Sequence, residues 1–327
     1  MRAVLIINPK ATSTSASARK AVLATFERTF DLKVKQTKSR GHAITVAQRA
    51  ADDGVDLVAV VGGDGTINEV INGLLHDRSS GQTQGPVLAI VPGGHANVLA
   101  YALGIVRDPA KAATQVTDLF LNGHTQAIGL GLANNRWFAI NAGLGIDAEI
   151  VSAVEDLRRR GLSASPATYI AGFMKSWAAT DRWSGPMTID GTGTDQEPQH
   201  VEDIVSTIIQ NTAPWSMAGD LRLDGSQHAS LNKGLDVVAL QQLSTPTMMR
   251  IAGTLLTGKS IADLPETTVF TDLNSIHITA QRPMPVQIDG DLSGSTTDIR
   301  FESVPQALTV VASPQAPQWP SMATNVT

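Results

Sequence analysis

Residues 56–75 read DLVAVVGGDGTINEVINGLL. The apolar run at 57–61 has the length of a buried strand, glycines surround Asp64, and the apolar spacing from Ile67 onward predicts a helix. A strand, a glycine loop and a helix start form an anion site in this order. Glycines let backbone N–H groups approach a phosphate, and a helix N-terminus carries about half a positive charge. The loop is neither GxxxxGKS/T nor GxGxxG, so the familiar triphosphate and dinucleotide loops do not apply.

The same residues also fit a structural alternative. Thr66 and Glu69 have the T-x-x-E spacing of a capping box, in which two side chains cap the start of one helix. Asp64 would then serve a cap or a turn. Capping does not explain three glycines around one aspartate, so we favour the anion site.

A second loop of the same kind lies in VLAIVPGGHANVLAYALGI, residues 87–105. Here a proline, two glycines and His95 join another buried strand to another helix. Two such loops in one parallel sheet converge at its carboxyl edge, where open α/β sheets bind ligands. PGG alone would be an ordinary turn, but the two loops together predict a nucleotide cleft.

The order of elements predicts two domains of different kinds. Through the first 125 residues, short apolar runs alternate with segments of helical spacing, which predicts a doubly wound parallel sheet. From about residue 125, extended segments such as SIHITA and DIRFE predict an antiparallel second domain. Residues 313–327 hold three prolines and no charge, which predicts a disordered tail.

Composition restricts the class of protein. The 327 residues, 42% hydrophobic and 17% charged, suffice for two domains and exclude global disorder. The absence of cysteine excludes disulfides, thiolate metal sites and cysteine nucleophiles, and no stretch approaches the roughly 18 apolar residues of a membrane span. Residues 1–50 hold ten Lys and Arg but only two acidic residues, Glu27 and Asp31. This basic excess fits two explanations equally: a surface that binds a polyanion such as a nucleotide, or a basic face that contacts only water. The acidic remainder and the few aromatic residues argue against nucleic acid.

Five motifs carry a resemblance to a known family: the opening NPK, GGDGT followed by NEV, the PGGxAN loop, FAINAGLGIDAE and a late VQIDGD. In order and spacing they resemble the diacylglycerol kinase catalytic-domain family, which includes bacterial lipid kinases and sphingosine kinases. The resemblance spans residues 1–312. It implies an ATP-binding α/β domain at 1–126, a β-sandwich domain bearing the lipid site at 127–303, and a strand at 304–312 that returns to the first domain, ahead of the tail at 313–327.

The resemblance also implies a site for ATP and Mg²⁺. The residues whose motif positions would surround the nucleotide are Asn8, Thr37, Gly62, Gly63, Asp64, Gly65, Thr66, Asn68, Gly93, Gly94, His95 and Asn97. Charge and loop placement add Lys10, Arg19 and Arg40 as candidate phosphate cations. Asp64 matches the aspartate that the family ties to magnesium through water or, in sphingosine kinases, to the base role.

Asp291 stands where the bacterial family usually has a glutamate proton acceptor, and Asp289 is the aspartate before it. From the residues alone, Asp-Gly between extended runs is better explained as a hairpin turn. The resemblance reverses that preference and implies catalytic roles for Asp291, Asp289 and Asp64. Asp147 resembles the position where a carboxylate meets the lipid head group, and it fits a helix cap equally well.

Three positions depart from the family pattern. His95 replaces a threonine or serine, and Val98 replaces a metal-linked aspartate of many members. Lys233 replaces an aspartate that helps bind a structural magnesium in some relatives, so we predict no metal there.

The resemblance therefore implies an ATP- and Mg²⁺-dependent lipid kinase that converts diacylglycerol to phosphatidic acid. Alternatives are a kinase of sphingoid bases or other lipid alcohols, a relative of NAD kinase, and a catalytically silent nucleotide or lipid sensor. We expect a cytoplasmic protein that contacts the inner face of the membrane transiently through its lipid substrate and binds no nucleic acid. The sequence leaves a homodimer open.

Overall fold

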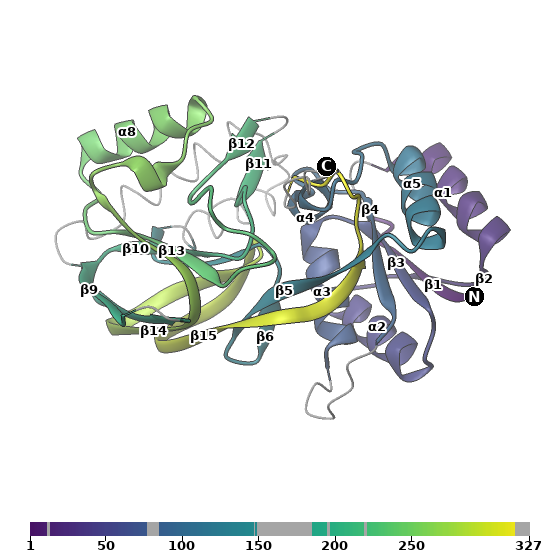
Figure 1. Cartoon of the computed structure of the whole chain (residues 1–327), viewed down its shortest axis with the longest axis horizontal. Helices are drawn as coiled ribbons and strands as arrows, with labels where there is room; N and C mark the ends of the chain where they lie inside the picture. Colours follow the sequence, from purple (N-terminus) through teal and green to yellow (C-terminus); the bar gives the residue numbers. More distant parts are fainter. Residues whose placement is uncertain are drawn as a thin grey trace, which may run out of the picture. The chain divides into compact units, whose positions relative to one another are not determined.

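The computed structural model describes residues 1–11, 14–76, 85–146, 148, 185–194, 197–218 and 221–317 (Figure 1). The chain divides into two compact units, one made of residues 1–129 and 306–327 and the other of residues 130–305. The boundaries expected at 126/127 and 303/304 lie within three residues of these divisions.

The first unit is a parallel α/β sheet. Its strands are β1 (Arg2–Ile7), β2 (Asp31–Gln36), β3 (Leu57–Gly62) and β4 (Val87–Pro92), paired in parallel in the order β4-β3-β1-β2. Its helices are α1 (Ala16–Thr29), α2 (His42–Asp52), α3 (Asp64–Leu74), α4 (Val98–Ala102) and α5 (Pro109–Leu121). Helix α1 packs with α5 and α2 packs with α3 (Figure 1), and every residue of β3 is buried. The predicted doubly wound sheet is confirmed.

Helix starts in this unit differ in how they are capped. Ser15 Oγ accepts a hydrogen bond from the Ala18 N–H at 3.1 Å, so a side chain caps α1. Asp108 caps α5 in the same way. Helix α3 begins at the N-cap Gly63, which makes no side-chain cap. The N-cap position of α3 therefore has no side chain that accepts a hydrogen bond from the first turn, unlike the N-cap positions of α1 and α5.

The second unit is an antiparallel β structure, which confirms the predicted class. Its strands are β5 (Thr125–Ala133, which starts in the first unit), β6 (Arg136–Phe138), β7 (Asn141–Leu144), β8 (Met187–Gly193), β9 (Gln199–Ile204), β10 (Ser206–Gln210), β11 (Ser216–Ala218), β12 (Leu221–Leu223), β13 (Leu235–Leu240), β14 (Thr267–Ile288) and β15 (Asp291–Val311). Helix α8 (Thr245–Leu256) and the short η2 (Ile261–Asp263) follow β13. Strands β13-β10-β7-β14-β15 lie in that order, and Phe138 and Phe301 meet edge to face in the core with ring centroids 6.1 Å apart.

Strand β15 belongs to both units. Its first residues pair with β14 in an antiparallel hairpin, and near its end Val310 pairs in parallel with Leu88 of β4. The strand that was expected to return to the first domain is therefore present.

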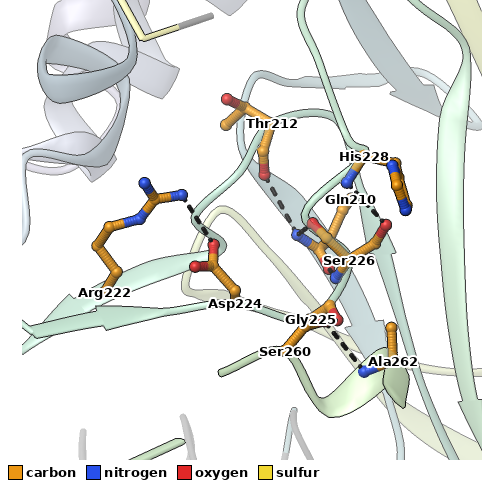
Figure 2. Close-up of polar contacts among 9 residues, drawn as sticks. All are labelled: Gln210, Thr212, Arg222, Asp224, Gly225, Ser226, His228, Ser260 and Ala262. Carbon is orange, nitrogen blue, oxygen red and sulfur yellow. Dashed lines mark hydrogen bonds and ion pairs between the residues drawn. The ribbon is translucent and has the colours of Figure 1, made fainter. Parts of the chain in front are cut away.

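A buried polar network fixes the loop that follows β12 (Figure 2). Gln210 Oε1 accepts a hydrogen bond from the Ser226 N–H at 2.6 Å, and the Ser260 hydroxyl donates to the Gly225 carbonyl. Ser226 Oγ also donates to Asp236 Oδ2 at 2.6 Å. Burial raises the pKa of Asp236, although this hydrogen bond opposes the shift.

The expectation of a disordered tail from residue 313 is wrong for residues 313–317. The Ser313 N–H donates to the Leu103 carbonyl at 2.9 Å, and Ala316 is only 1% exposed. Gly104, with φ of +71°, lets the chain pass this close, because a Cβ on it would stand 2.8 Å from the Ser313 side chain. The rest of the tail lies outside the described residues.

None of the helices within the described ranges is both long and apolar enough to cross a bilayer.

Candidate active site

The two predicted glycine loops touch each other at the carboxyl ends of β3 and β4. A Cβ built on Gly94 would stand 2.6 Å from Gly63 Cα, and one built on Gly63 would stand 3.1 Å from Gly94 Cα. The Gly93 N–H donates to the Gly62 carbonyl at 2.8 Å. Side chains at Gly63 and Gly94 would force the loops apart, so glycine is required here for the close approach.

The first strand contributes to the same loop. Asn8 follows β1, and its Nδ2 donates to Thr66 Oγ1 at 2.9 Å while its Oδ1 accepts from the Lys10 N–H at 2.9 Å. The structure thus brings together Asn8 and Thr66, which are 58 positions apart in sequence.

The capping-box explanation of the loop is wrong. Glu69 does not reach back to the start of its own helix. Its Oε1 accepts from the Gly41 N–H at 2.8 Å and its Oε2 from the Ala43 N–H at 3.1 Å, so it caps α2 instead. Thr66 binds Asn8, and the N-cap of α3 is Gly63. A local motif failed here because each of its members found a partner far away in sequence.

Gly65 faces open space. A Cβ built on it would meet no heavy atom within 4 Å, and no hydrogen bond among the described residues engages its N–H. The protein itself therefore gives no steric reason for glycine at this position of the first turn of α3. A helix-start N–H that no hydrogen bond among the described residues engages is suited to an anion.

Thr14 is a further polar group beside the loops, and sequence reasoning missed it. Its hydroxyl would lie 3.0 Å from a Cβ on Gly93, and the residue is only 6% exposed. Thr14 Oγ1 has no hydrogen-bond partner in the part of the chain that the structure describes. A buried hydroxyl without a partner costs about 1–3 kcal/mol, and a ligand oxygen bound beside Gly93 would supply one.

The second loop is closed by its own asparagine. Asn97 Oδ1 accepts from the Gly94 N–H at 2.8 Å, and its Nδ2 donates to the Gly94 carbonyl at 2.7 Å. Asn97 is buried with a φ of 52°, so it shapes the turn as well as starting α4. His95 is exposed at the tip of this loop. This loop therefore holds its shape through Asn97 and presents His95 to solvent.

The remaining predicted nucleotide residues come from other segments of the first unit. Thr37 follows β2 and donates its N–H to the Ile7 carbonyl at 2.9 Å. Asn68 is buried within α3, and its carbonyl accepts from Asn72 Nδ2 at 2.9 Å. Of the candidate cations, Arg19 donates from Nη1 to the Pro9 carbonyl at 2.9 Å, while Lys10 and Arg40 are exposed.

In the second unit, Asp289 and Gly290 form the two-residue turn between β14 and β15. Ile288 pairs with Asp291 across the turn, and the φ angles of 46° at Asp289 and 78° at Gly290 are those of a primed hairpin turn. Asp289 Oδ2 accepts from the Ala139 N–H at 2.9 Å, and its Oδ1 accepts from the N–H groups of Ile140 and Asn141 at 2.9 and 3.0 Å. Asp289 therefore clamps the turn to residues 139–141. A proton-acceptor role for it stays a prediction that these contacts do not favour.

Asp291 is the more accessible carboxylate of the hairpin. It begins β15, its side chain is 28% exposed, and its Oδ2 lies 3.2 Å from Arg136 Nη2 of β6. Asp291 thus lies directly after the turn that Asp289 anchors, and its role as proton acceptor stays a prediction. Sequence reasoning did not connect Arg136 to it, because 155 positions separate the pair. Asp147, the predicted lipid-head-group residue, lies outside the described residues.

The residues at the glycine loops fit the phosphates of a nucleotide. Among the described residues, the Gly65 N–H and the buried Thr14 hydroxyl have no hydrogen-bond partner, and the space beside the Gly65 Cα is open. No group of three or more His, Asp or Glu side chains in the described ranges could hold a metal by itself. A Mg²⁺ that travels with ATP needs only one or two carboxylates besides the phosphates, and Asp64 in the first turn of α3 would supply one.

Comparisons with known proteins agree with this architecture. Residues 2–133 match the family described as "Diacylglycerol kinase catalytic domain", and residues 141–312 match "YegS C-terminal NAD kinase beta sandwich-like domain". A Bacillus subtilis protein named diacylglycerol kinase is 30% identical over 278 residues, which cover 84% of each chain. One of the same name from Staphylococcus haemolyticus is 33% identical over 153 residues, 46% of this chain and 43% of its own. A crystal structure of a diacylglycerol kinase from Bacillus anthracis, 22% identical, matches the fold with a TM-score of 0.67 over 96% of this chain and 98% of that chain.

Proposed function

Because this chain belongs to the diacylglycerol kinase family, we propose that it transfers the γ-phosphoryl group of ATP to the hydroxyl of diacylglycerol and so forms phosphatidic acid. The family membership expected from the five motifs is confirmed, and with it a kinase activity. The observation that carries the nucleotide half of the proposal is the pair of touching glycine loops, beside which Thr14 and Gly65 present polar groups that the described protein does not use.

In the proposed reaction, the glycine loops hold the triphosphate. Backbone N–H groups at the start of α3 and the Thr14 hydroxyl donate to phosphate oxygens, and the dipole of α3 adds favourable potential. Bound Mg²⁺ would neutralise charge on the leaving ADP. Asp64 would orient that ion from the first helical turn. These groups position the γ-phosphorus for in-line attack.

Asp291 acts as the proposed general base. The hydroxyl oxygen of the acceptor attacks the γ-phosphorus and forms the new O–P bond, while the bond from that phosphorus to the ADP oxygen breaks. The hydroxyl proton passes to the Asp291 carboxylate. Asp289 contributes indirectly, since its three backbone hydrogen bonds fix the turn from which Asp291 projects.

The substrate class sets the proposed cellular setting. Diacylglycerol resides in the bilayer and ATP in the cytoplasm, so the enzyme would work as a peripheral protein at the inner face of the membrane. Nucleic acid has no place in this reaction. A homodimer is compatible with it but is not required by it.

The test is an incubation with γ-labelled ATP and Mg²⁺ against vesicles that contain diacylglycerol, a sphingoid base or neither, with a parallel incubation with NAD. The NAD arm is needed because the C-terminal match is described by its likeness to the NAD kinase sandwich. We expect labelled phosphatidic acid, and a loss of about 10²- to 10⁴-fold in turnover for Asp291→Asn. Label in NAD or in the sphingoid base, with none in diacylglycerol, would contradict the substrate assignment. ATP binding without transfer to any acceptor would indicate a silent sensor.

A further inference from the structure

A surface pocket lies at the turn between β5 and β6, in the second unit. Its volume is about 280 Å³. The lining residues are Ala133, Asn134, Asn135, Arg136, Val286, Ile288, Ser293, Thr296 and Ile299. The lining has an apolar part and a polar part. The floor is apolar and belongs to the main core of the unit, whereas the turn and the start of β15 supply amide, guanidinium and hydroxyl groups.

This pocket adjoins the proposed general base. Arg136, which lines the pocket, is the residue that pairs with Asp291 at 3.2 Å. Ile288, which also lines it, stands directly opposite Asp291 in the β14–β15 register. Residues opposite each other in an antiparallel pair project to the same face, so Asp291 lies on the face of the hairpin that carries the pocket.

We propose that this pocket binds the ester-bearing glycerol backbone of the acceptor lipid, and that Arg136 joins it to Asp291 as a positioning residue. The inference rests on the proposed function and assigns the acceptor side of that site. The sequence motifs pointed to neither the pocket nor Arg136.

The chemistry of the lining suits an uncharged ester of glycerol. Ester carbonyls accept hydrogen bonds and donate none, and the asparagine amides and the guanidinium are donors. A guanidinium carries five N–H donors in a planar fork, so Arg136 can pair with a carboxylate and also bind a carbonyl. The methylene groups of the glycerol backbone would rest on Val286, Ile288 and Ile299, which are 2–5% exposed.

Size limits what the pocket receives. Pockets that enclose whole drug-sized ligands measure about 300–1,000 Å³, and this one lies just below that range. It therefore accommodates the backbone and its two esters rather than two acyl chains. The acceptor would be recognised by its backbone next to the reacting hydroxyl, with the chains left outside this pocket.

Filling the pocket tests the proposal. Ser293 is exposed and lines the pocket, whereas Ser295 is exposed on the same strand and does not line it. Ser293→Phe should raise the KM for 1,2-dioctanoylglycerol in mixed micelles at least tenfold and leave the KM for ATP within twofold of wild type. The matched control Ser295→Phe should leave both constants within twofold. Asn135→Leu, on the exposed turn, is a second pocket variant whose effect should match that of Ser293→Phe, and melting curves check that each variant folds.

Arg136 is tested by separating kcat from KM. Arg136→Met should lower kcat for dioctanoylglycerol at saturating ATP and also raise the KM for the lipid, and Arg136→Lys should restore part of both. A merely structural arginine would change the melting temperature without this pattern. If wild type transfers phosphate to no lipid, the proposed function itself fails. If wild type is active and both pocket variants keep its lipid KM, the pocket assignment alone is refuted.

Discussion

Gly65→Ala separates nucleotide binding from folding. An alanine Cβ at this position would meet no protein atom within 4 Å. Within a helix, alanine is more favourable than glycine by about 0.5–1 kcal/mol, so the variant should be at least as stable as wild type. Its methyl group would nevertheless occupy the open space that we assign to the phosphates. Loss of one hydrogen bond to a charged oxygen costs about 1.5–3 kcal/mol. That is about a 10- to 150-fold fall in kcat/KM for ATP, at about 1.4 kcal/mol per factor of ten.

The assay is a steady-state titration of ATP at a fixed, saturating concentration of dioctanoylglycerol, together with melting curves with and without ATP. The control is Gly253→Ala, which also lies in a helix and whose added Cβ would also meet nothing within 4 Å, but in α8 of the second unit. We expect the control to keep the wild-type KM and kcat. Gly65→Ala should show the loss in kcat/KM and a smaller rise in melting temperature on addition of ATP.

A Gly65→Ala variant with wild-type kcat and KM for ATP would refute the reasoning, because the open space at the start of α3 would then not receive the phosphates. A Gly65→Ala variant that is destabilised more than the Gly253→Ala control would refute the premise that folding does not require glycine at residue 65.

Three further outcomes follow from the described contacts. Thr14→Val should raise the KM for ATP several-fold without destabilising the apo protein, and Thr14→Ser should retain most of the binding, as measured by the same titration. Asp289→Ala should expose the amides of residues 139–141 to hydrogen exchange at least about tenfold faster, because losing buried partners costs about 1–3 kcal/mol each. Unchanged exchange would contradict the clamp. Burial raises the pKa of Asp236 above its ordinary 3.8. The native state therefore keeps a proton that the unfolded chain releases, so stability relative to Asp236→Asn should fall as the pH rises from 3.8 through the raised pKa in urea melts.

The fold class could be predicted from the sequence because its signals are local. The strand, glycine loop and helix of residues 56–75 form one continuous segment whose hydrophobic pattern and loop composition agree. The antiparallel domain was equally readable from extended runs separated by turn residues. The start of the disordered tail was placed too early. Three prolines and no charge cannot reveal the contacts of Ser313 and Ala316 with Leu103 and Gly104, because those contacts depend on the tertiary structure.

The site was less predictable because its contacts are long-range. Glu69 sits at capping-box spacing yet bonds to N–H groups 26 and 28 positions away, and Asn8 reaches Thr66 across 58 positions. Thr14 lies in a run of serines and threonines that has no motif signal of its own. The contact between Arg136 and Asp291 joins the β5–β6 hairpin to the β14–β15 hairpin, across 155 positions, so no local pattern announces it. Sequence patterns identify which loops matter, whereas the partners within them depend on the tertiary structure.

At the hairpin of Asp289, the observed turn and the proposed catalytic role are compatible explanations of one motif. The turn requires two successive residues with positive φ, a conformation that asparagine, aspartate and glycine tolerate best. Asp289 satisfies this backbone demand, and its carboxylate anchors the turn to three N–H groups of residues 139–141. An anchored turn fixes the direction of the next residue, which is Asp291. A general base must be held close to its productive geometry, so the anchoring by Asp289 would serve the base that we propose at Asp291. In the proposed mechanism the DGD sequence would therefore divide the two tasks between carboxylates two positions apart: Asp289→Ala should loosen the turn, whereas Asp291→Asn should slow transfer and leave the turn intact.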